Sequence, residues 1–385
     1  MKDEKKAPKL RFKGFTDDWE QCKLGDVCEE VSGNNGNVKG LPILTISAAN
    51  GWMNQKDRFS QVIAGNELKK YTLLEKGHLA YNHGNSKLAK YGTAFVQNLY
   101  DQALVPRVYH SFKMKTENNP YYVEYYFATK KLDRELARLV TSGARMDGLL
   151  NINKKDFFKI KFEVPTPVEQ SLISTILQKL DQTITLHEEK KHQLERLKSA
   201  LLQKMFADKS GYPDIRFEGF SDEWEQCKLG DVAKINSGKD YKGLQPGKIP
   251  VYGTGGYMLS VNDKLSDIDA IGIGRKGTID KPYYLNAPFW TVDTLFYVTP
   301  RGTVDISFMF PLFKNINWKR YDESTGVPSL SKNTIKKIRV SFPQNNEQVK
   351  IGDLFQKITQ IITLHDQKLN LLKLVKQSLL QKMFI

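Results

Sequence analysis

Apolar residues recur at helical spacing through an uninterrupted stretch from Thr166 to Phe206. Thr166 can serve as the N-cap, Pro167 occupies the first helical position, and Glu169 completes the pattern of a capping box. Every seventh residue of the stretch belongs to one seam, which predicts pairing with another helix. The seam residues are Ile173, Leu180, His187, Leu194 and Leu201. A helix of about 40 residues would be roughly 60 Å long.

A second stretch of the same kind runs from Glu347 to Phe384, 178 positions after its counterpart, and both stretches end in LLQKMF. Further apolar residues widen the face of the first helix beyond a narrow seam. They are Ile176, Leu177, Ile184, Leu197 and Met205. His365 aligns with His187, so two antiparallel helices would bring these side chains together near a pseudo-two-fold axis. A polar seam residue more often fixes the register than binds a ligand.

The beginning of the chain is also repeated. Residues 8–33 and 213–238 share the nonapeptide WEQCKLGDV at an offset of 205 residues, which exceeds the offset of the helices by 27. Each half therefore has a constant opening segment, a body that differs in length and sequence, and a constant helix. Different bodies within one frame indicate two similar modules that recognise different things; drift in unimportant loops is the alternative.

The bodies mix short strands and turns. The strands predicted in the first body are 44–48, 78–81, 93–96, 108–113 and 159–164, with a helix over 120–140. Those predicted in the second body are 270–274, 278–284, 294–298 and 338–342, with a helix over 306–313. We expect an extended opening segment followed by a short turn, with Phe12, Phe15 and Trp19 packed. The connections are too short for parallel crossovers, which predicts an α+β fold with mainly antiparallel sheets.

The chain of 385 residues carries a net charge of +15 and has a sequence pI of about 9.4. A basic protein of this size most often binds a polyanion, although a basic surface without consequence is the alternative. No apolar run is long enough for a membrane span, and the charged start is not a signal peptide. The three cysteines, Cys22, Cys28 and Cys227, have no zinc spacing. We expect a cytoplasmic protein.

Catalytic motifs are missing from the sequence. The segment GIGRKG at 272–277 matches GxGxxG, but a strand-like segment with two prolines follows it where a dinucleotide fold needs a helix. There is no phosphate-binding loop, no HExxH motif and no adenine-methyltransferase signature. We therefore predict no catalytic residue, no metal ligand and no cofactor bound by this chain.

Polar loops with cations remain as candidates for DNA binding. Arg275 and Lys276 lie on a turn flanked by glycines, where Arg can bind guanine and Lys can contact a phosphate. The comparable turn of the first body contains Asn82, His83, Asn85, Ser86 and Lys87. Arg145 lies in SGARMDGLL, which precedes the closing strand as STGVPSL does in the second body. The remaining candidates are Lys239, Tyr241, Lys242 and Thr254. Ordinary turn chemistry is the alternative for each residue.

The repeated FxGFxxxWEQCKLGDV segments, the bodies that close on PxxxEQ and the LLQKMF helices together resemble the DNA-specificity (S) subunits of Type I restriction–modification enzymes. The resemblance covers essentially the whole chain. It implies a pseudo-two-fold tandem repeat, with two target-recognition domains separated by two long antiparallel coiled-coil helices. The corresponding segments are 1–165 and 208–343 for the domains, and 166–207 and 344–385 for the helices.

This resemblance also implies partners. Specificity subunits bind double-stranded DNA and two methyltransferase subunits, which carry S-adenosylmethionine. In the complete complex they also assemble with ATP- and Mg-dependent restriction subunits. The subunit itself would be non-catalytic and would recognise a bipartite, asymmetric target. A self-sufficient DNA-modifying enzyme and a coiled-coil scaffold without DNA affinity are the alternatives.

Overall fold

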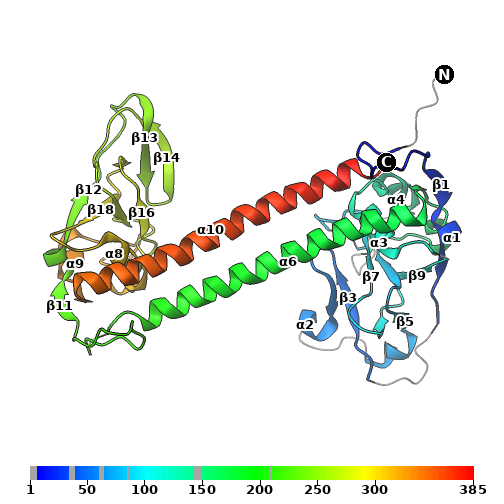
Figure 1. Ribbon diagram of the computed structural model, residues 1–385, viewed down its shortest axis with the longest axis horizontal. Helices are drawn as coiled ribbons and strands as arrows, with labels where there is room; N and C mark the ends of the chain where they lie inside the picture. Colours follow the sequence, from blue (N-terminus) through cyan, green and yellow to red (C-terminus); the bar gives the residue numbers. More distant parts are fainter. Residues whose placement is uncertain are drawn as a thin grey trace. The chain divides into compact units, whose positions relative to one another are not determined.

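The computed structural model describes residues 7–33, 40–59, 65–84, 86–115, 117–141, 149–208 and 210–385 (Figure 1). The chain forms two compact units. The first comprises Met1–Leu186 and Leu369–Ile385, and the second comprises His187–Lys368. Each unit therefore contains one part of each long helix, whereas the division made from the sequence treats the helices as separate segments.

The first unit is built around a four-stranded antiparallel sheet in the order β2-β9-β6-β7. Its strands are β1 (Glu20–Lys23), β2 (Cys28–Glu30), β3 (Leu44–Ser47), β4 (Gly51–Asn54), β5 (Thr72–Glu75), β6 (Leu79–Asn82), β7 (Thr93–Val96), β8 (Gln102–Val105), β9 (His110–Met114) and β10 (Lys161–Val164). Its short helices are α1 (Leu24–Val27), α2 (Gln55–Phe59), η1 (Gly65–Lys70), α3 (Pro120–Ala128), α4 (Asp133–Leu139) and α5 (Lys154–Phe157). Its largest core cluster includes Trp19, Phe112 and Tyr122.

The second unit repeats this sheet in the order β12-β18-β15-β16. Its strands are β11 (Glu225–Lys228), β12 (Ala233–Ser237), β13 (Pro246–Gly253), β14 (Gly256–Val261), β15 (Ala270–Gly274), β16 (Tyr283–Leu285), β17 (Trp290–Thr291), β18 (Leu295–Pro300) and β19 (Arg339–Phe342). Its short helices are α7 (Leu229–Val232), α8 (Ile306–Asn315), η2 (Trp318–Tyr321) and α9 (Lys332–Lys337). Figure 1 shows β13 and β14 as a hairpin on the side of this unit away from α10.

The predicted α+β fold is confirmed, and the pairing between named strands is antiparallel apart from the short parallel pair β13–β17. The helix predicted over 120–140 is wrong in one respect. It is divided into α3 and α4, because Lys130 between them has a positive φ of 62° that no helix accommodates. The strand predicted over 278–284 shrinks to β16, since Gly277 turns the chain with φ 86° and Pro282 has no amide hydrogen for a ladder.

The two long helices are α6 (Pro167–Lys204) and α10 (Asn345–Lys382), each of 38 residues. The predicted seam residues Ile173, Leu180, His187, Leu194 and Leu201 are all buried or partly buried. Two of the residues predicted to widen the apolar face beyond the seam, Ile176 and Leu197, are 38% and 48% exposed. In the second unit the two helices run antiparallel. The Nδ1 atoms of His187 and His365 lie 2.9 Å apart, and Lys198, further along α6, donates to Thr359, which comes earlier in α10.

The identical LLQKMF tails have equivalent environments. Met205 and Phe206, at the end of α6, belong to the core of the second unit, where the ring of Phe206 lies 5.4 Å from that of Phe308. Met383 and Phe384, after α10, belong to the core of the first unit. Figure 1 shows the end of α10 beside α3, and the ring of Phe384 lies 5.3 Å from that of Tyr122. Each helix thus completes the core of the unit built from the other repeat.

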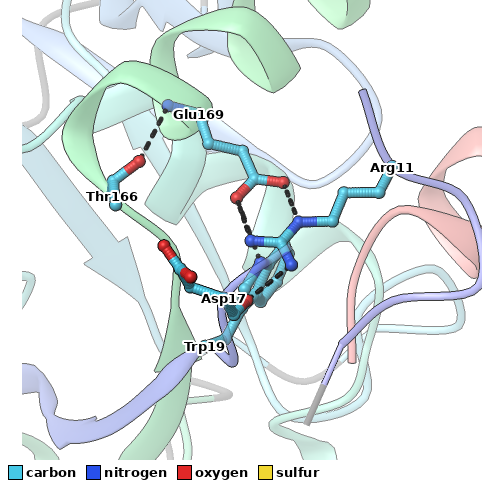
Figure 2. Close-up of polar contacts among 5 residues, drawn as sticks. All are labelled: Arg11, Asp17, Trp19, Thr166 and Glu169. Atoms are coloured by element: carbon cyan, nitrogen blue, oxygen red, sulfur yellow. Dashed lines mark hydrogen bonds and ion pairs between the residues drawn. The ribbon is translucent and has the colours of Figure 1, made fainter. Parts of the chain in front are cut away.

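The opening segment is joined to the start of α6 by a buried ion pair (Figure 2). The guanidinium of Arg11 donates to both carboxylate oxygens of Glu169 at 2.7 and 2.8 Å, and Trp19 donates to the same carboxylate at 3.3 Å. The amide of Glu169 donates to the Thr166 hydroxyl at 3.4 Å, so this half of the predicted capping box is present. The carboxylate that would complete the box binds Arg11 instead.

The second repeat has the same ion pair between Arg216 and Glu347, with two contacts of 2.8 Å. The next residue of each PxxxEQ motif is also used. Gln170 donates to the Pro165 carbonyl at 2.9 Å, and Gln348 donates to that of Pro343 at the same distance. These repeated contacts explain why the frame of both halves is nearly the same sequence.

Candidate nucleic-acid interface

Loops from separate parts of the second body meet at one end of its main sheet. Ser237, at the end of β12, pairs with Phe296 of β18, and Gly274, at the end of β15, pairs with the adjacent Leu295. Residues that follow β12 and β15 therefore emerge at the same end of the sheet. Lys239 N donates to the Thr291 carbonyl, and Arg275 N donates to the Thr294 carbonyl, at 2.9 and 2.8 Å. The predicted residues Lys239 and Arg275 thus flank one short segment.

The turn that carries Arg275 and Lys276 pairs with the loop STGVPSL. Leu330 N donates to the Arg275 carbonyl at 3.0 Å, and Gly277 N donates to the Pro328 carbonyl at 2.8 Å. The side chains of Arg275 and Lys276 are exposed, and the guanidinium carbon of Arg275 lies 6.0 Å from the centroid of the Phe296 ring. Two cations are therefore presented on a backbone that a second loop holds in place.

Asp322, which is not among the residues predicted from the sequence, organises this second loop. Its carboxylate accepts from the amides of Ser329 at 2.9 Å and Ser324 at 3.0 Å. These backbone hydrogen bonds, from Ser329 and Ser324, lower the pKa of Asp322. An Asp that precedes a Ser by two residues is a signal for such an Asx turn, and it could have identified Asp322.

The other candidates of the second body occupy different surroundings. Thr254 lies in the turn between β13 and β14, just beyond Tyr252, whose carbonyl accepts from Val292 N at 3.0 Å. Lys242 is exposed on a turn where its amide donates to the Asp240 carboxylate at 3.1 Å. Tyr241 is partly buried against a small apolar cluster, so packing accounts for much of its side chain.

The first unit repeats the pairing of the two loops. Leu150 N donates to the His83 carbonyl at 2.8 Å, and Gly84 bridges Leu149, as Leu330 pairs with Arg275 and Lys276 bridges Ser329 in the second unit. This correspondence confirms that the turns predicted to be comparable are equivalent. It places His83 at the position of Arg275 and Gly84 at that of Lys276.

His83 occupies this position in a different way from Arg275, because only 3% of it is exposed. Its Nε2 lies 2.7 Å from the Val108 carbonyl, its Nδ1 contacts the Leu150 carbonyl, and its ring stacks on His110 at 5.0 Å. Burial, then the neighbouring His83, lowers the pKa of His110 to about 3. The prediction that His83 faces DNA is therefore corrected: its imidazole lies in the core and ties the paired loops together.

The remaining candidates of the first body give a mixed result. Asn82 donates to the Ile46 carbonyl at 3.2 Å and accepts from Gly84 N at 3.1 Å, which favours the turn-chemistry alternative. Ser86 and Lys87 are exposed. Asn85 and Arg145 lie outside the described residues.

Within the described ranges, no cluster of three or more His, Cys, Asp or Glu side chains is placed to hold a metal ion. None of the helices in this part of the chain has the length and the hydropathy that crossing a bilayer requires. Cys22, Cys28 and Cys227 are free thiols.

Comparisons with known proteins agree with the repeated architecture. The family model described as "Type I restriction modification DNA specificity domain" matches residues 16–196 and again 221–374. This chain is similar to two curated relatives from Methanocaldococcus jannaschii. They are the specificity subunits of the Type I restriction enzymes MjaVIII and MjaIX, and they are 28% and 27% identical to this chain over 122 and 127 residues. These matches cover 31% of this chain and only 28% of each relative.

A solved structure shows the same fold over nearly the whole chain. The S subunit of a Type I restriction–modification system from M. genitalium matches with a TM-score of 0.68 and 17% identity, over 98% of this chain and 99% of that one. Since the family model matches both halves and covers most of the sequence, the chain belongs to the family of Type I restriction–modification DNA specificity domains.

Proposed function

We propose that this chain is the specificity subunit of a Type I restriction–modification complex and that each body recognises one half of a bipartite, asymmetric DNA target. One observation carries the proposal: the same pair of loops is built twice, with Arg275 and Lys276 in one unit and His83 and Gly84 in the other. The equivalent backbones expose two cations in one unit and neither of them at the same positions in the other, which is the kind of difference that two unlike half-targets require.

The chemistry of the second unit suits a duplex. The exposed guanidinium of Arg275 can donate two hydrogen bonds to the O6 and N7 atoms of guanine in the major groove. Lys239 and Lys276 are exposed near it and can contact phosphates, which position the protein without distinguishing sequences. The net charge of +15 adds a general attraction to DNA that weakens with salt.

The long helices offer the surface for partner subunits. Several of their apolar side chains are exposed although both helices are already paired. They include Leu172, Leu186, Leu197, Ile361, Leu364, Leu371 and Leu374. Exposed apolar stripes of this kind fit helices of a partner. In this proposal two methyltransferase subunits bind there and supply catalysis with their S-adenosylmethionine, and restriction subunits with ATP and Mg join the complete complex. The chain itself performs no chemistry.

An exchange of bodies tests the proposal. Residues 239–325 would be replaced by the corresponding segment of another family member, and the chain would be expressed with its methyltransferase subunit. Mapping of genomic methylation should show that one half of the target changes while the other half is retained. A change in both halves would contradict modular recognition. A purified complex without salt-dependent affinity for duplex DNA would contradict DNA binding altogether.

A further inference from the structure

Each unit contains a cavity between its main sheet, a short helix and the long helices α6 and α10. Several residues that line the two cavities occupy equivalent positions in the two repeats. The cavity of the second unit, about 1100 Å³, lies among α6, α8, α10 and residues near β16. That of the first unit, about 480 Å³, lies among α3, β7, α6 and α10. The corresponding residues are Phe310 and Glu124, Lys314 and Ala128, Thr359 and Asp181, and Lys198 and Lys376.

The cavity of the second unit is open to solvent as a groove, and two lysines in its lining have no ion-pair partner among the described residues. Lys198 donates to the Thr359 hydroxyl at 2.6 Å, and the ammonium of Lys314 lies 5.4 Å from the centroid of the Phe310 ring. Among the described residues neither lysine forms an ion pair. The acidic wall residue Asp269 accepts from Tyr284 and from the amide of Ala287, each at 2.8 Å.

The surroundings of both lysines make their charged forms less favourable. Partial burial lowers the pKa of Lys198. Lys314 is exposed as a residue, but desolvation by the neighbouring wall, followed by the charge of Lys198, lowers its pKa as well. A carboxylate brought between the two ammonium groups would offset both effects. Since the carboxylate of Asp269 already accepts from Tyr284 and Ala287, a partner is a suitable source of such a charge.

The walls beside the lysines are apolar. They contain Leu202, Phe310, Pro311, Phe355 and Leu364, and 55% of Leu364 is exposed. A DNA backbone makes mainly polar contacts and gains little from such walls. An amphipathic protein segment can cover them and place its acidic side chains on the lysines, which is the helix-in-groove mode of recognition.

The equivalent cavity of the first unit has the opposite character. Lys376 forms an ion pair of 2.5 Å with Asp181, which also accepts from Tyr125 at 2.8 Å, so this lysine is neutralised. Glu124 and Asp133 add two more carboxyl groups to the wall. An acidic segment that fits the second unit would be repelled here.

We propose that the groove of the second unit is the docking site for an acidic amphipathic segment of a partner subunit, whose carboxylates meet Lys198 and Lys314, and that the first unit does not accept this segment. This inference rests on the proposed function, in which methyltransferase subunits bind the chain. It adds that one of the two equivalent positions makes a charge-dependent contact that the other lacks.

The test measures the affinity of the full chain for its methyltransferase subunit, without DNA and at constant ionic strength. K198E/K314E should weaken binding at least tenfold, and K198Q/K314Q should weaken it less. The matched control K234E/K337E changes the same net charge at exposed lysines outside the groove and should leave the affinity within twofold. Thermal unfolding of each variant establishes that it is folded.

A gain of binding supplies the second arm. A128K/D181T adds a lysine at the position of Lys314 and removes the carboxylate that pairs with Lys376, so it should strengthen binding of the methyltransferase subunit in a way that increasing salt weakens. Unchanged affinity of a folded K198E/K314E variant would overturn the inference while leaving the proposed function intact. Binding of duplex DNA by K198E/K314E is measured separately, and a loss of DNA affinity with unchanged affinity for the methyltransferase subunit would overturn the inference in favour of a phosphate contact. If the wild-type chain bound no methyltransferase subunit, the inference and the proposed function would both fail.

Discussion

At the scale of single residues, Arg275 and His83 show how one backbone position serves two purposes. The backbone carbonyl of each residue accepts a hydrogen bond from the amide of a leucine in a second loop. The side chain of Arg275 is nevertheless exposed, whereas His83 is only 3% exposed. The difference follows from the side chains, because the short imidazole contacts two backbone carbonyls inside the unit, whereas the long guanidinium carries a permanent charge. If the first unit recognises a half-target as proposed, side chains other than that of His83 have to make the contacts.

We expect Arg275→Ala to relax recognition of one base pair in one half-target, at a cost of about 1–3 kcal/mol if the guanidinium contacts a base. Competition binding by the assembled complex, with targets substituted at each position, measures this. Lys242→Ala, on a neighbouring exposed turn, is the matched control and should leave base preference unchanged. An equal loss on every sequence would assign Arg275 to a phosphate.

Glu124 provides a prediction about pH. Its carboxylate accepts from Val96 N at 2.6 Å, and burial, partly offset by this bond, raises the pKa of Glu124 to about 7. The folded protein therefore holds this proton more tightly than the unfolded chain does. Stability attributable to Glu124 is present below its ordinary value of 4.5 and is lost as the pH rises through 7.

Glu124→Gln should remove this loss, because an amide oxygen can still accept from Val96 N but carries no charge. Relative to wild type, the variant should gain about 1–3 kcal/mol of stability between pH 5 and pH 8. Hydrogen exchange of amides in the first unit at the two pH values measures the difference. Glu135→Gln, at an exposed ion pair with Arg138, should show no such gain. A pH response equal to that of wild type would show that Glu124 does not titrate in this range.

At the scale of elements, the tail of each long helix packs into the core formed by the other repeat: that of α6 into the second unit and that of α10 into the first. Phe384 is 2% exposed and contacts the rings of Tyr122 and Tyr126 in the first unit. We expect Phe384→Ala to destabilise the first unit by about 3–5 kcal/mol, because a large cavity opens in an aromatic cluster. Phe206→Ala is the matched change and should destabilise the second unit instead.

Hydrogen exchange resolved by peptide distinguishes the two variants, since each unit reports its own opening. For Phe384→Ala, faster exchange should be concentrated in β6, β9 and α3, although the substitution lies at the far end of the sequence. Equal protection of these elements in the variant and the wild type would contradict the role of the tail in the core.

At the scale of the whole molecule, α6 and α10 are the continuous segments shared by both units. If they act as rigid connectors between two recognition bodies, their length should set the gap between the half-targets. Inserting seven residues after Lys191 and seven after Leu369 preserves the seam and adds roughly 10 Å of helix. The preferred gap should grow by about three base pairs. Methylation mapping measures the gap, and an unchanged gap would mean that the helices do not determine it.

Much of the element pattern could be predicted because it depends on short-range periodicity and turn chemistry. The long helices, the main strands β6, β7 and β15 and the helix α8 lie close to their predicted positions. The hairpin β13–β14 and the short strands β5 and β8 were not predicted. Pro246 and Pro250 argue against a strand at β13, and β5 and β8 have only four residues each, which is too short for a clear alternation.

The sequence by itself determined the duplication, the frame of both halves and the absence of catalytic motifs, since repeats and motifs are local properties of the chain. Only the tertiary structure decided which side chains are available. It buried His83, neutralised Lys376 with Asp181, left Lys198 and Lys314 without a countercharge, and placed each helical tail in the other repeat's core. Burial and charge pairing depend on residues that are distant in the sequence, such as His83 and Leu150 or Asp181 and Lys376, and no local pattern contains them.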